Sequence, residues 1–178
     1  MLGLALLMTE TLGNKHLPLT EAYIGELMLT TTLARALIRA GEADAKLDEW
    51  GVMCPDSVTI ESSRNLFMTA YPRMTEILQL LSSSSMMILP MEADFKTPMA
   101  PFIEQYLATE GSNARDRVRL FHLVWDIACS SFGQRQVHYE RFFASDPLTR
   151  ARALASTYPK KEVTDRVLEF LNRDDHVE

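Results

Sequence analysis

The chain has 178 residues, enough for one domain or two small ones, and its 47% apolar and 24% charged residues are ordinary for a globular protein. This composition excludes collagen-like, low-complexity and disordered chains. The formal net charge of −6, from 18 basic and 24 acidic residues, argues against broad binding to nucleic acids or anionic membranes.

The hydrophobic pattern is helical almost throughout, because apolar residues recur at three- and four-residue spacing and only seven glycines interrupt them. Asp56 or Ser57 is a candidate cap for one helix, and Asp146 followed by Pro147 is a strong start for another. We expect helices over residues 2–12, 18–45, 57–81, 98–108, 112–144, 147–158 and 162–172.

Between these helices we expect a loop over residues 47–55, a helix end or loop at the serine run 82–85, and an extended segment over 86–90. The helices 18–45 and 112–144 would be about 42 Å and 48 Å long at ~1.5 Å per residue. A compact globule of this size has a diameter near ~40 Å. The sequence therefore predicts one all-α domain over residues 1–178, an elongated up-and-down four-helix bundle with short extra helices.

Common catalytic motifs are missing from the sequence, including the nucleophile elbow, the dinucleotide-binding glycine pattern and the Walker A loop. The histidines do not have metal-ligand spacing, and the acidic clusters read as solvated helix faces. We therefore assign no catalytic residue and no metal site. The four histidines are His16, His122, His138 and His176.

One segment carries candidate chemistry. The expected helix 112–144 places apolar and aromatic residues in one sector of about 120° at ~100° per residue. Arg135 falls in that sector, close to the small residues Ser131 and Gly133. A guanidinium in such surroundings needs a partner. It either contacts an anion or cofactor or pairs with a carboxylate of a neighbouring helix. The residues in the sector are Phe121, Val124, Trp125, Ala128, Phe132, Tyr139, Phe142 and Phe143.

The cellular compartment is indicated only indirectly. Two cysteines, Cys54 and Cys129, do not make a disulfide framework and fit a reducing compartment. The apolar start lacks a basic leader and a small-residue cleavage site, so we expect no signal peptide. No apolar run approaches the ~20 residues of a membrane-spanning helix. We therefore expect a cytoplasmic protein.

Several motifs occur in an order that resembles the 4-hydroxyphenylacetate 3-hydroxylase family, specifically the C-terminal helical domain of its large oxygenase component. The resemblance covers nearly the whole chain. The motifs are MTETLG at 8–13, AYPR at 70–73, LPMEADF at 89–95, RLFHLVWD at 119–126, SFGQRQ at 131–136, YERFF at 139–143 and Asp146-Pro147.

The resemblance implies an acyl-CoA-dehydrogenase-like fold, in which a C-terminal four-helix bundle follows a helical domain and a middle β-domain and builds a tetramer. It also implies a monooxygenase that uses reduced FAD from a separate reductase, together with oxygen, to hydroxylate a phenol ortho to its hydroxyl group. In that family, the segment that matches Ser130 and the SFGQRQ motif at 131–136 contacts the flavin. The candidate FAD-binding residues are therefore Ser130, Ser131, Phe132, Gly133, Gln134, Arg135 and Gln136.

The sequence also departs from the family. The N-terminal and middle β-domains are not in this chain, so we expect weak or absent FAD binding, no turnover by the chain alone, and a dimer or tetramer. Serines occupy 82–85, where relatives tend to have a glycine-rich turn. Two alternatives remain open: a stand-alone helical self-association module derived from such an enzyme, and a domain of a 4-hydroxybutyryl-CoA dehydratase-like enzyme.

Overall fold

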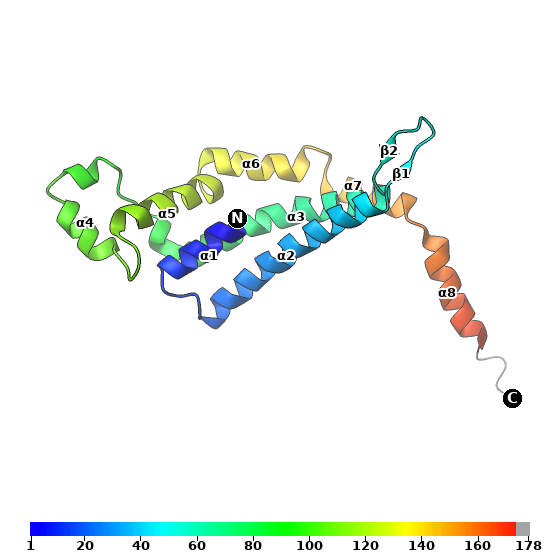
Figure 1. Ribbon diagram of the computed structural model, residues 1–178, viewed down its shortest axis with the longest axis horizontal. Coiled ribbons are helices and arrows are strands. Elements are labelled where there is room, and N and C mark those ends of the chain that lie inside the picture. The colour runs from blue at the N-terminus through cyan, green and yellow to red at the C-terminus, as the bar shows by residue number, and fades with distance from the viewer. Residues whose placement is uncertain (174–178) are drawn as a thin grey trace.

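Two long antiparallel helices, α2 (Pro18–Ala43) and α3 (Ser57–Ser82), run side by side through the molecule (Figure 1). The computed structural model describes residues 1–173. Both helices agree closely with the expected boundaries, and Asp56 caps α3 as expected, because its carboxylate accepts from the Thr59 backbone N–H at 2.8 Å. The predicted all-α bundle is confirmed.

The other elements surround this pair. The helix α6 lies along α3, while α8 projects away from the bundle (Figure 1). The remaining elements are α1 (Leu2–Thr11), α4 (Ala100–Leu107), α5 (Ala114–Ala128), α6 (Ser131–Phe142), α7 (Pro147–Thr157), α8 (Lys160–Arg173) and the 3-10 helices η1 (Ser83–Met86) and η2 (Asp94–Lys96).

One apolar core holds the bundle together, and helices α1, α2, α3 and α5 contribute to it together with η1. Removing such side chains from water is the main favourable contribution to folding. The buried core residues are Ala5, Met8, Ile24, Leu27, Ile77, Leu78, Leu81, Met86, Phe121, Val124 and Ala128.

The prediction of one continuous helix over 112–144 is wrong. The chain forms α5 and α6 instead, with a break at Cys129 and Ser130. The apolar period continues across the break and hides it, but Ser130 caps a new helix by accepting from the Gly133 backbone N–H at 2.9 Å. The predicted length of 48 Å for this helix is therefore wrong as well.

Two short segments also differ from expectation. The expected loop 47–55 forms most of an antiparallel hairpin that begins one residue earlier, with β1 (Lys46–Leu47) and β2 (Met53–Cys54). Its turn is organised by Asp48, whose carboxylate accepts from two backbone N–H groups. The start of the expected extended segment 86–90 is helical instead, since Met86 ends η1 and Met87 has helical dihedral angles.

Candidate functional site

The first turn of α6 is shaped by contacts within the chain itself. The Ser130 hydroxyl donates to the Asp126 carbonyl at 2.6 Å and accepts from the Gly133 N–H. A Cβ atom at Gly133 would stand 2.5 Å from the Asp126 carbonyl oxygen and closer still to that of Ile127. The small size of Gly133 therefore permits the close approach of α6 to the end of α5, and Ser130 and Gly133 fix the direction of α6.

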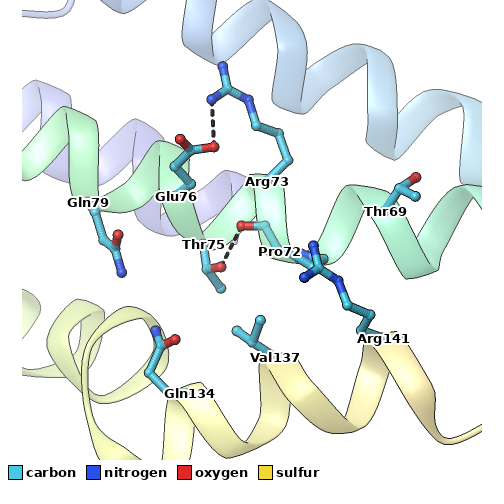
Figure 2. Close-up of a pocket in the computed structure, with 9 residues that line it drawn as sticks. All are labelled: Thr69, Pro72, Arg73, Thr75, Glu76, Gln79, Gln134, Val137 and Arg141. Carbon is cyan, nitrogen blue, oxygen red and sulfur yellow. Dashed lines mark hydrogen bonds and ion pairs between the residues drawn. The ribbon is translucent and has the colours of Figure 1, made fainter. Parts of the chain in front are cut away.

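A groove of about 350 Å³ lies between α3 and α6 (Figure 2). From α6, Gln134, Val137 and Arg141 line it, at the spacing that places residues on one helix face. The α3 wall is mostly polar. It consists of Thr69, Pro72, Arg73, Thr75, Glu76 and Gln79. Of the seven predicted site residues, only Gln134 lines this groove.

Two side chains join the walls of the groove at one backbone atom. The Nε2 amides of Gln79 and Gln134 both donate to the Ala128 carbonyl, each at 2.6 Å. This carbonyl belongs to the last turn of α5, where carbonyl oxygens lack helical partners. Because both amides are engaged there, Gln134 has a structural role in addition to lining the groove.

Arg73 points away from α6 toward α2 (Figure 2). Its guanidinium donates to the two carboxylate oxygens of Glu26 at 2.7 and 2.9 Å, and to Glu76 at 2.7 Å. Hydrogen bonding to Arg73 lowers the pKa of Glu26, while the two carboxylates raise the pKa of Arg73. Since each of its three nitrogens donates to a carboxylate, Arg73 acts as a clamp between α2 and α3.

The outer face of α6 carries exposed aromatic side chains. Phe132, Tyr139 and Phe143 are 65%, 51% and 58% exposed, and the rings of Tyr139 and Phe143 stack with centroids 5.1 Å apart. The prediction that the apolar residues of α5 and α6 share one helix face is therefore wrong. The chain changes direction at Ser130, so the apolar face of α5 is buried in the core while that of α6 lies at the surface. Arg135 is also exposed on α6.

Arg135 makes no ion pair with any residue that the structure describes, so within these residues the alternative of a pair with a carboxylate of a neighbouring helix is not met. Gln136 instead donates to Glu140 at 2.7 Å. Within residues 1–173, the backbone N–H groups of Ser131 and Phe132 have no hydrogen-bond acceptor. These two donors, the positive end of the helix dipole and the Arg135 guanidinium together suit a phosphate group.

Sequence reasoning missed Arg141, which occupies the groove at the same helix face as Gln134. Its spacing of seven residues from Gln134 is the signal that could have found it. Among residues 1–173, no three potential metal ligands cluster together. No helix in that range has the length and apolar character needed to cross a bilayer.

Comparison with known proteins gives a consistent result. The profile of the family described as "4-hydroxyphenylacetate 3-hydroxylase C terminal" matches residues 1–172. A probable 4-hydroxyphenylacetate 3-monooxygenase of Bacillus subtilis is 37% identical over 98% of this chain. The crystal structure of the oxygenase component (HpaB) of 4-hydroxyphenylacetate 3-monooxygenase complexed with FAD and 4-hydroxyphenylacetate superposes with a TM-score of 0.93 over 97% of the chain, at 37% identity.

The chain spans about a third of the length of the curated relatives it matches, 36% for the Bacillus protein and likewise 36% for the HpaB crystal chain. A 4-hydroxybutyryl-CoA dehydratase from N. maritimus is also similar, with a TM-score of 0.80 at 17% identity over 94% of this chain and 35% of that one. That likeness establishes a shared fold only.

Proposed function

The chain belongs to the 4-hydroxyphenylacetate 3-hydroxylase family, and we propose that it is the C-terminal helical part of the oxygenase component of a two-component monooxygenase. In this proposal the whole enzyme hydroxylates a phenol such as 4-hydroxyphenylacetate, using oxygen and reduced FAD from a reductase. Residues 1–178 form one helical domain that contacts FAD. The higher identity to the hydroxylases than to the dehydratase favours this branch.

The first turn of α6 carries this proposal. Ser131 and Phe132 offer free backbone N–H groups, and Arg135 offers five donors one turn later. These groups fit the pyrophosphate of FAD, which needs several donors and positive charge. The exposed Phe132 ring offers an apolar contact for the ring systems of the cofactor. When bound, reduced FAD supplies the electrons for activating oxygen.

The other residues of the predicted segment have supporting roles in this proposal. Ser130 and Gly133 set the direction of α6 and so orient the two free N–H groups. Gln134 fixes the junction with α5 through Ala128. Because the chain spans about a third of its relatives, we assign the phenol site and the remaining FAD contacts to other parts of the enzyme. The chain alone then binds FAD weakly and has no turnover.

A titration of FAD fluorescence with the 178-residue chain tests the contact. Arg135→Ala is expected to weaken binding by roughly 10- to 150-fold, since a charge-assisted bidentate contact is worth about 1.5–3 kcal/mol. Arg135→Lys should rescue little, because an ammonium lacks the planar fork. Arg141→Ala is the matched control. It removes the same charge from α6 but lies in the groove, away from the first turn.

Melting curves separate a binding defect from a folding defect. Arg135 has no ion-pair partner among the described residues, so Arg135→Ala should leave the melting temperature unchanged. If the wild-type chain shows no binding at about 1 mM FAD, or if Arg135→Ala and Arg141→Ala behave alike, the contact is wrong. The self-association module then becomes the better function, since aromatic side chains such as Phe132 and Phe143 are exposed on α6. In either case we propose a dimer or tetramer.

A further inference from the structure

A second hollow lies where α2 and α3 meet the end of α6, and we call it the α2–α3–α6 pocket. Its volume is about 260 Å³. Since a dry cavity of about 150 Å³ is enough to hold benzene, this pocket has room for one ring and a short substituent. The space exists partly because two residues that line it, Ala34 and Ala144, are small. The pocket shares no lining residue with the groove between α3 and α6.

The walls of the pocket are mostly apolar, and two of them are aromatic rings held in place by neighbours. The ring of Phe67 on α3 packs against Tyr71, with centroids 5.5 Å apart. The ring of Phe143, which follows α6, stacks on Tyr139 at 5.1 Å. Met68 also lines the pocket and is only 2% exposed. Aromatic rings and a methionine sulfur make favourable contacts with a further ring, so these walls favour an aromatic ligand.

A cluster of three charges at the edge of the pocket carries an excess of positive charge. The carboxylate of Glu61 accepts from Arg64 at 2.6 Å and from Arg150 at 3.1 Å. Neither arginine has another carboxylate partner among residues 1–173. Because two guanidinium groups share one carboxylate, one positive charge is left without a partner. Arg64 lines the pocket, so this charge is available to an anionic group of a ligand bound there.

The pocket has one acidic side chain, Glu140 on α6. One of its carboxylate oxygens accepts from Gln136 at 2.7 Å. A carboxylate repels a second anionic group but accepts a hydrogen bond from a hydroxyl group. A ligand of this pocket therefore needs one anionic group, for Arg64, and at another position a neutral donor for Glu140.

We propose that the α2–α3–α6 pocket binds a small aromatic monocarboxylate. Its ring packs between Phe67 and Phe143. Its carboxylate meets Arg64, and a hydroxyl group on the ring donates to Glu140. This site is separate from the phenol site, which we assign to other parts of the enzyme, and from the first turn of α6. It therefore does not depend on the proposed contact with FAD.

A nuclear magnetic resonance titration of the 178-residue chain with 4-hydroxyphenylacetate, up to about 10 mM, locates the site and measures its Kd. We expect a Kd of about 0.1–3 mM, as is typical of a ligand this small. The methyl signals of Ala34, Ile38 and Met68, which all line the pocket, should shift. The neutral 4-hydroxyphenylacetamide has nearly the same shape and should bind roughly tenfold more weakly, because it cannot form the charge-assisted contact.

Two variants test the two polar ends of the ligand. Arg64→Met should raise the Kd of 4-hydroxyphenylacetate roughly tenfold and leave that of the amide within about twofold. Arg39→Met is the matched control, because it removes the same charge from an exposed position on α2 outside the pocket. The wild-type chain should bind 4-hydroxyphenylacetate about threefold more tightly than phenylacetate, and Glu140→Met should remove this preference.

Circular dichroism and melting curves confirm that each variant folds. A folded wild-type chain without shifts at about 10 mM ligand overturns the proposal, as do equal effects of Arg64→Met and Arg39→Met. A preference for the hydroxyl group that survives Glu140→Met overturns it too. Titrating FAD in the presence of the aromatic acid separates the two sites. An unchanged Kd for FAD supports independent sites, whereas displacement of FAD would place the acid at the first turn of α6 and overturn the pocket. Absence of FAD binding by itself contradicts only the proposed function.

Discussion

Arg73 on α3 holds both carboxylate oxygens of Glu26 on α2, at 2.7 and 2.9 Å. The two residues are 47 positions apart, and their pairing fixes the register of the two longest helices. The guanidinium is planar and presents its donors as a fork, so it matches a carboxylate in a way that a lysine cannot. Glu76 on α3 accepts from the same guanidinium at 2.7 Å.

Breaking this clamp should lower stability and remove part of its pH dependence. Because the pKa of Glu26 is lowered in the folded state, its contribution is present above the ordinary value near 4.5 and is lost as the pH falls through the folded value. Glu26→Gln should lower the melting temperature by about 2–4 °C at pH 7 and by less at pH 3. Glu76→Gln is the control, since it removes only a pair within one helix. Equal effects of the two variants would contradict the clamp.

The shared Ala128 carbonyl predicts a strongly non-additive pair of variants. Gln79→Met or Gln134→Met alone should lower the free energy of unfolding by about 0.5–1 kcal/mol, because the other amide still donates to the carbonyl. The double variant should cost about 2–3 kcal/mol, because the carbonyl of this buried residue then has no donor. Chemical denaturation of the four proteins gives the coupling energy. Simple additivity would show that the two amides act independently.

The capping signals were the most reliable part of the sequence. Asp146 accepts from the backbone N–H groups of Leu148 and Thr149, and α7 begins at Pro147 as expected. Such a cap can be predicted from the sequence, because one polar side chain and the proline after it determine it locally. The break at Ser130 was not readable from the apolar period, since hydrophobic spacing continues across it. It depends on how closely α6 can approach α5.

The candidate site shows the same limit. The predicted site residues 130–136 are neighbours in the sequence, but they do not share one surface of the fold, because α6 begins inside this segment. Ser130 and Gly133 stabilise the backbone turn between α5 and α6. Gln134 lines the groove between α3 and α6, and Arg135 is exposed. Resemblance to a family identified the segment, but only the tertiary arrangement separates residues that hold the turn from residues that could meet a ligand.

Gly133 provides a direct test of that separation. Gly133→Ala should lower the free energy of unfolding by about 1–3 kcal/mol, because the added methyl group collides with the Asp126 and Ile127 carbonyls. Gly3→Ala is the matched control. A Cβ atom at Gly3 meets nothing within 4 Å, so this change in α1 should be neutral or slightly stabilising. Thermal and urea melts measure both. A neutral Gly133→Ala would mean that α6 can move away from α5 at little cost.

Ser83, at the end of α3, has φ 49° and ψ −133°, a conformation that glycine adopts more readily than serine. Glycine lacks the Cβ atom that makes these angles unfavourable for serine. Ser83→Gly should therefore raise the free energy of unfolding by about 1 kcal/mol, because the strain at Cβ disappears. Ser84→Gly should lower it by about 0.5–1 kcal/mol, since Ser84 has no positive φ to relieve and glycine adds entropy to the unfolded chain. Urea denaturation of the two variants beside wild type measures the difference, and equal losses of stability would show that the turn at Ser83 carries no strain.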